Sequence, residues 1–266
     1  MIYVVTVALT RTSPTHQGQV RPGIAFFVVV FVFVLGARLC MTSSGRSGVG
    51  VFLFVLSGWT LSLIFHEFAH AYVAWRGGDT SIPAKGYLTL DPRRYADPIT
   101  SIALPLLIVI IGGIGLPGGA VWINRSALRS RVVASLVSLA GPATNLGLAA
   151  LFVLPVSADI VNPVENFQLA AALTFLGFLQ IVAFVLNMLP IPGLDGYGAI
   201  EPFLPHHLRQ MLVPVQRWAF FILIGLYFYI PAIRDGFWSL IVGIMGFVDV
   251  DQDLIREGFD LFRFWR

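Results

Sequence analysis

Six apolar stretches along the chain are long enough to enter or cross a lipid bilayer. They lie at about 24–41, 49–75, 99–117, 131–154, 168–190 and 217–248. Because roughly 20 helical residues cross the hydrocarbon core of a bilayer, the pattern predicts an all-α polytopic membrane protein with about six transmembrane helices. We expect a single membrane domain over residues 24–250. It would lie between a retained N-terminal tail, 1–23, and a C-terminal tail, 251–266.

Two of these stretches depart from a simple span. The stretch 99–117 contains Pro105, Pro117 and three glycines, which free backbone groups that lipid cannot satisfy. It fits either a re-entrant segment or a weakened span. The stretch 217–248 is too long for one span and is interrupted by Pro231. It fits either a helical hairpin or one strongly bent helix.

Short β-strands are predicted in the polar regions that flank the stretch 99–117. The segments 85–90 and 119–124 alternate apolar and polar residues, as half-buried strands do. Both segments would lie near the C-terminal end of the second span.

The composition excludes a water-soluble globular enzyme. Apolar residues make up 57% of the chain and charged residues only 12%, about half the charge of a typical soluble domain. The net charge of +3 comes from basic residues in loops, without a long basic run, so no nucleic-acid partner is expected. The single cysteine, Cys40, excludes an internal disulfide and a cysteine-based metal cluster. A metal would therefore be held by histidine and carboxylate groups.

The second apolar stretch carries the motif HEFAH at residues 66–70. His66 and His70 are four residues apart, so both imidazoles leave the same face of a helix. Such a pair binds zinc, and the neighbouring Glu67 is placed to act as general base. Ionisable side chains inside a span are costly unless they are paired or metal-bound. The motif therefore favours a functional site over the alternative, in which His66 and His70 are ordinary buried core residues.

Asp195 is the best candidate for a third ligand. A catalytic zinc takes three protein ligands and keeps one open position. Asp195 follows the fifth stretch in NMLPIPGLDG, where prolines and glycines end the helix and allow the chain to turn back. An Asp-Gly pair in such a place is by itself an ordinary turn. The histidine pair is what favours metal binding.

Three motifs together resemble those of the site-2 protease family of intramembrane zinc metalloproteases. HEFAH lies in a predicted span, GPATN occupies 141–145, and an N-x-x-P-x-x-x-x-D-G pattern runs from Asn187 to Gly196. They occur in the family's order between about residues 57 and 200. The segment LTLDPRRYADP also resembles a loop of small members, with Asp91 where Asn is commoner and Tyr95 where His is common. The PDZ domain or nucleotide-sensing pair of larger members has no counterpart, so regulation of that kind would need a separate partner.

The resemblance implies one zinc ion per chain with three ligands, His66, His70 and Asp195. It implies that Glu67 is the catalytic base and that Asn145 and Asn187 line the site. Either amide could donate to an oxyanion or hydrogen-bond between helices. The expected enzyme is a zinc metalloendopeptidase that cleaves single-span membrane proteins in or near their transmembrane segment, in regulated intramembrane proteolysis. An unwound substrate would pair with the predicted strands.

The membrane topology can be tested by charge. His70 and Asp195 must meet at one depth, so an even number of crossings separates them, and two remain if 99–117 is re-entrant. Combined with a C-terminal hairpin, this topology puts most of the 17 basic residues on the face of the zinc site. The positive-inside rule then places the termini and the active site toward the cytoplasm of a multi-pass protein, as expected in the cell membrane.

Two other functions fit parts of the pattern. A metal-ion transporter also has histidines and carboxylates within spans, although the chain has no internal repeat and no polar groups at several depths. A catalytically inactive membrane scaffold would have no chemical need for Glu67. His206 and His207 are predicted to be solvated rather than ligands.

Overall fold

A computed structural model describes the chain in several ranges: 20, 22–42, 48–91, 93, 121–216, 218–247 and 251–265. Within these residues all regular elements are helices. The four long ones are α1 (Ile24–Thr42), α2 (Val49–Gly77), α4 (Arg131–Ser157) and α5 (Phe167–Asn187). The shorter ones are η4 (Arg125–Ala127), α6 (Asp195–Ile200), η5 (Glu201–Phe203), α7 (His206–Gln216), α8 (Ala219–Tyr229), α9 (Pro231–Phe247) and α10 (Gln252–Phe262).

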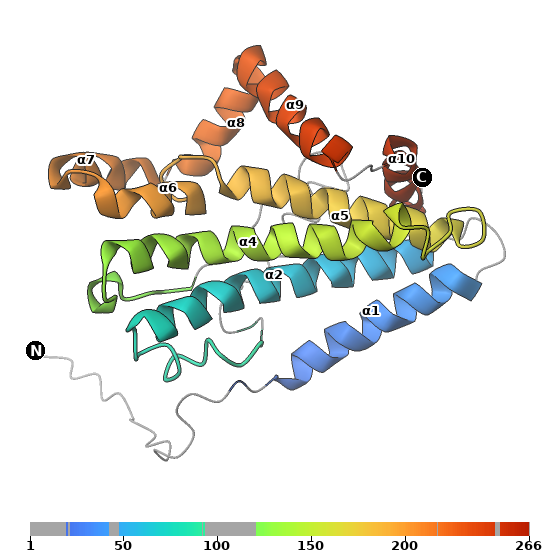
Figure 1. The fold of residues 1–266 in the computed structure, drawn as a ribbon, viewed down its shortest axis with the longest axis horizontal. Coiled ribbons are helices and arrows are strands. Elements are labelled where there is room, and N and C mark those ends of the chain that lie inside the picture. Colours follow the sequence, from blue (N-terminus) through green and yellow to red (C-terminus); the bar gives the residue numbers. More distant parts are fainter. Residues whose placement is uncertain are drawn as a thin grey trace, which may run out of the picture.

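The four long helices form a bundle in which α2 lies between α1 and α4 (Figure 1). Each is long and apolar enough to cross a membrane, and α7 with α8 forms a fifth candidate that is bent by 83°. The prediction of an all-α multi-pass membrane protein is therefore confirmed, whereas the expected six spans exceed what the described residues contain. The stretch 99–117, predicted as re-entrant or spanning, lies outside the described residues.

Burial differs sharply between the helices of the bundle. Only 11% of the apolar window of α1 is buried, against 78% for α5. α1 therefore presents Phe27 and Phe31 outward, where lipid can cover them, while α5 is the internal helix of the bundle. Its buried polar side chains consequently lie deep in the protein.

The last apolar stretch is broken between α8 and α9 at Ile230. Pro231 is the first residue of α9, a position where its missing N–H costs nothing. The two helices form an inverted V beside α5 (Figure 1). The broken helix predicted from the sequence is therefore present.

The C-terminal residues do not form the expected tail. α10 packs against α5 and α2, and Leu261 and Phe262 are buried. Gly258 allows the close approach, because a Cβ there would lie 2.3 Å from the carbonyl oxygen of Ala171. Figure 1 shows α10 at the end of the bundle opposite α6. The hairpin topology considered from the sequence would put the C-terminal residues at the end that carries α6, and the side of the membrane on which each end lies stays a prediction.

The strand predicted at 85–90 is also wrong. Residues 80–88 form successive turns, and Gly86 and Leu90 have φ values of 76° and 52°, which an extended strand does not contain. The carboxylate of Asp79 organises the loop by accepting hydrogen bonds from the amide and hydroxyl of Ser81 at 3.0 and 2.6 Å. These local side-chain bonds replace strand pairing.

Of the second predicted strand, residues 121–124 are described, and they have no strand partner within the described chain. The amide of Asn124 donates to Asp79 at 2.7 Å. The ammonium group of Lys85 donates to the carbonyl oxygen of Trp122, also at 2.7 Å. This segment is therefore tied to the loop that follows α2, near the C-terminal end of that helix.

Candidate metal centre

Two turns of α2 supply the histidine pair of the site. Because His66 and His70 are four residues apart, their rings project from one face of the helix, and their Nε2 atoms lie 3.0 Å from each other. Both side chains are buried. The helical spacing thus produces the pair that the sequence predicted.

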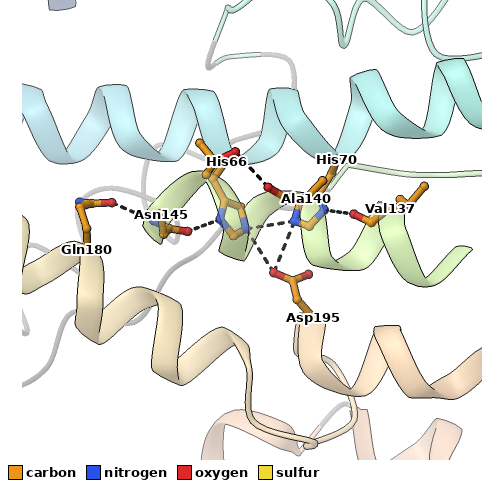
Figure 2. A network of polar contacts seen from close by, with 8 residues as sticks. His66, His70, Val137, Ala140, Asn145, Gln180 and Asp195 are labelled. Carbon is orange, nitrogen blue, oxygen red and sulfur yellow. Dashed lines mark hydrogen bonds and ion pairs between the residues drawn. The ribbon is translucent and has the colours of Figure 1, made fainter. Parts of the chain in front are cut away.

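A break in the chain after α5 brings Asp195 to the pair. The backbone turns over Pro190 and Pro192, with Gly193 at φ 104°, and Asp195 begins α6. Its Oδ2 lies 3.3 Å from Nε2 of His66 and 3.4 Å from Nε2 of His70 (Figure 2). The predicted convergence of these three side chains is present in the structure.

The three donor atoms fit a zinc ion. Tetrahedral zinc with ligand bonds of about 2.0–2.1 Å requires ligand atoms about 3.3 Å apart. The three separations here, 3.0, 3.3 and 3.4 Å, are close to that value. Two imidazole nitrogens and a carboxylate oxygen are also ligands that a catalytic zinc accepts.

Acceptors behind the two imidazoles fix their tautomers. Nδ1 of His66 lies 2.5 Å from Oδ1 of Asn145, and Nδ1 of His70 lies 2.6 Å from the carbonyl oxygen of Val137. Since each partner is an acceptor, each Nδ1 carries the proton and each Nε2 keeps its lone pair. This is the usual arrangement of histidines that bind a metal. The contact between His70 and Val137 was not predicted from the sequence, because Val137 contributes only its backbone carbonyl group.

Glu67 lies between the two histidines in sequence and is 5% exposed. The backbone amide of Val121 hydrogen-bonds to its carboxyl group. The carboxyl is also in electrostatic contact with all three predicted ligands. A buried carboxylate beside a candidate metal centre is suited to accept a proton there.

Gly141 of α4 contacts the metal centre directly. A Cβ at this position would lie 2.3 Å from Nε2 of His70 and 2.5 Å from Nε2 of His66. Any larger residue would therefore enter the space of the ligand atoms. Gly141 is the first residue of the GPATN motif, and its contact with the ligand histidines was not predicted from the sequence.

The short helix α6 and the adjoining η5 are attached to α4 and η4. The hydroxyl of Ser135 donates to the carbonyl oxygen of Ala199, and Arg125 pairs with Glu201 at 2.5 Å. Gly198 packs against Ser138, whose Oγ would lie 2.6 Å from an added Cβ. These contacts hold the helix that begins with the carboxylate ligand candidate.

The two predicted asparagines differ in their surroundings. Asn145 is engaged on both sides, by His66 and by Gln180, to which its Nδ2 donates at 2.8 Å. This geometry favours the interhelical role over an oxyanion contact. Asn187, the last residue of α5, is buried, and its Nδ2 has no hydrogen-bond partner in the described part of the chain. His206 and His207 are exposed on α7, outside the metal-ligand group formed by the described residues.

The similar proteins found by comparison are all named putative zinc metalloproteases. The chain is 43% identical over 256 residues to "Putative zinc metalloprotease Rip2" of Mycolicibacterium smegmatis, which covers 95% of this chain and 97% of that protein. Rip2 of Mycobacterium tuberculosis is 41% identical over 262 residues, 95% of this chain and 98% of its own. "Putative zinc metalloprotease YwhC" of Bacillus subtilis is 33% identical over 175 residues, 63% and 76% of the two chains. No family model and no solved structure matches. These names imply that the metal for this site is zinc.

Proposed function

Because the chain belongs to the site-2 protease family of zinc metalloproteases, we propose that it hydrolyses peptide bonds in or near the transmembrane segment of single-span membrane proteins. One observation carries the proposal. A metal-ligand triad of two histidines and Asp195 converges next to Glu67, inside a bundle of helices that are each able to span a bilayer. A protease site in this position acts on substrates within the membrane.

In this mechanism the ligand triad would hold zinc through Nε2 of His66, Nε2 of His70 and Oδ2 of Asp195. Zinc in such a site lowers the pKa of a bound water to about 7 and polarises a carbonyl group. The carboxylate of Glu67 takes the proton of the attacking water and passes it to the leaving amine. The amide of Val121 keeps one oxygen of that carboxylate in place.

A helical substrate must unwind before its scissile carbonyl is accessible, because its amides are hydrogen-bonded within the helix. We propose that residues 121–124 receive the unwound segment. They are tied to Glu67 at one end and to Asp79 at the other, so an added strand would pass beside the catalytic base. A separate regulatory partner remains a prediction.

We propose that the site faces the cytoplasm of the cell membrane. The end of the bundle that carries α6 includes Arg125 and Arg129 before α4, Arg131 as the first residue of α4, and Arg209 on α7. The opposite end carries Arg256 and Arg263 on and after α10, so among the residues that the structure describes the end with α6 has more basic groups. The positive-inside rule supports this orientation.

The test compares the wild type with Glu67→Gln, both purified in detergent. Zinc content and cleavage of a model single-span substrate are measured side by side. We expect about one zinc per chain in both proteins and cleavage by the wild type alone, since the amide cannot accept the proton. Wild-type zinc binding without cleavage of any single-span substrate would favour a scaffold, and equal cleavage by both proteins would contradict the role of Glu67.

A further inference from the structure

A buried chain of amides leads from the middle of α5 to the metal centre. Gln180 is 0% exposed, and its Oε1 accepts a hydrogen bond from Nδ2 of Asn145 at 2.8 Å. Oδ1 of the same asparagine faces Nδ1 of His66 at 2.5 Å. Figure 2 shows this line of three side chains, which come from α5, α4 and α2.

The orientation of the Asn145 amide decides which nitrogen of His66 is protonated. With Oδ1 toward the ring, Nδ1 must donate, and Nε2 keeps the lone pair that a metal requires. If the amide turned over, Nδ2 would face Nδ1, and the proton would move to Nε2. The orientation with Oδ1 toward His66 is selected by a hydrogen-bond acceptor next to Nδ2 of Asn145. The side-chain carbonyl oxygen of Gln180 is that acceptor.

The other end of Gln180 is consistent with this orientation. Its Nε2 has no hydrogen-bond partner among the residues that the structure describes. A small cavity of about 20 Å³ adjoins the amide. It is lined by Trp59, Ser62, Leu63, His66, Asn145, Gln180 and Ala183. A reversed Gln180 would set two NH₂ groups against each other.

We infer that Gln180 is a positioning residue for metal binding. It fixes the amide of Asn145, which in turn holds His66 in the tautomer that presents Nε2 to the metal. The inference rests on the proposed function, since it requires His66 to be a zinc ligand. It adds a residue of α5 that the ligand motifs do not contain and that touches neither metal nor substrate.

The test measures zinc affinity by competition with a chelator. Gln180→Met keeps the volume and removes the acceptor, so we expect a loss of about tenfold, the lower end for second-sphere partners of metal ligands. Gln180→Glu keeps an acceptor oxygen and should stay close to the wild type. The matched control is Thr174→Val. Thr174 lies on the same helix, is 2% exposed, and its hydroxyl has no partner in the described chain.

A double-mutant cycle separates positioning from a general structural role. Asn145→Asp presents an acceptor to His66 in either orientation, so Gln180→Met should cost little in that background. A merely structural role would give the same loss in both backgrounds and in the thermal unfolding of the metal-free protein.

The inference is overturned if wild type and Gln180→Met bind zinc equally, or if Gln180→Glu loses as much affinity as Gln180→Met. Failure of the proposed function has a different signature, because the wild type itself would then bind no zinc or cleave no substrate.

Discussion

The α-carbon of Gly141 lies so close to His70 that a methyl group on it would approach Nε2 to 2.3 Å. The backbone of α4 therefore forms one wall of the metal centre. Space for the metal exists only because this wall has no side chain.

Gly141→Ala is expected to lower zinc affinity by at least tenfold while the protein still folds. Alanine is a better helix former than glycine by about 1 kcal/mol, so any loss must come from the site. Metal content and chelator competition measure the effect. The control is Gly147→Ala on the same helix, where an added Cβ meets nothing within 4 Å. Equal zinc binding by both variants would show that α4 does not border the metal.

Ile123→Pro should reduce cleavage at least tenfold and leave zinc content unchanged. Proline removes a backbone amide from the segment proposed to pair with the substrate. The amides of Val121 and Asn124 already serve Glu67 and Asp79, so position 123 changes pairing without removing those two bonds. Ile123→Ala is the control for loss of the side chain. Cleavage by the proline variant at the wild-type rate would exclude strand pairing at this position.

The loop after α2 should open in acid. Burial alone would raise the pKa of the Asp79 carboxyl, but hydrogen bonds from Ser81 and Asn124 bring it below its ordinary value. Because the folded pKa is lowered, the stabilisation is complete above the unfolded value of about 3.9 and is lost as the pH falls through the folded pKa. Hydrogen exchange at the Asn124 amide measures this change. In Asp79→Asn the protection should be weaker and should not change over that pH range.

The two ends of the bundle should face opposite sides of the membrane. Ser126 is exposed in η4 near α6, and Asp253 is exposed on α10. Cysteines placed singly at these positions, in a Cys40→Ala background, should react with an impermeant thiol reagent from opposite sides of sealed vesicles. Labelling of both from the same side would restore the terminal hairpin predicted from the sequence.

Local periodicity was enough to predict the ligand pair. His66 and His70 share a helix face whatever surrounds them. The prolines before Asp195 predicted the end of the preceding helix, after which the chain turns back toward the histidines. Gln180 and Gly141 could not be found in this way, because their roles depend on the distance between helices. Asn145 lies 79 positions from His66. The 3.6-residue helical period relates only residues of one helix, so it cannot predict a contact over this separation.

The strand predicted at 85–90 and the C-terminal tail predicted at 251–266 differ from the structure for specific reasons. The alternation at 85–90 imitates a strand, but Asp79 supplies the loop with hydrogen bonds that a strand would otherwise obtain from a neighbour. α10 is too short and polar to register as a span. Its buried positions, Leu254, Gly258 and Leu261, nevertheless have the i, i+4, i+7 spacing of an amphipathic helix.

The position of Asp195 on α6 has a consequence for biosynthesis. The histidines are synthesised early, on the second helix, whereas the carboxylate follows only after α4 and α5. A ribosome-bound or truncated chain that ends before α6 has the base and two nitrogens but no third ligand. Such a chain should be unable to retain catalytic zinc, so nascent and prematurely terminated products would be harmless to other proteins inserting into the same membrane.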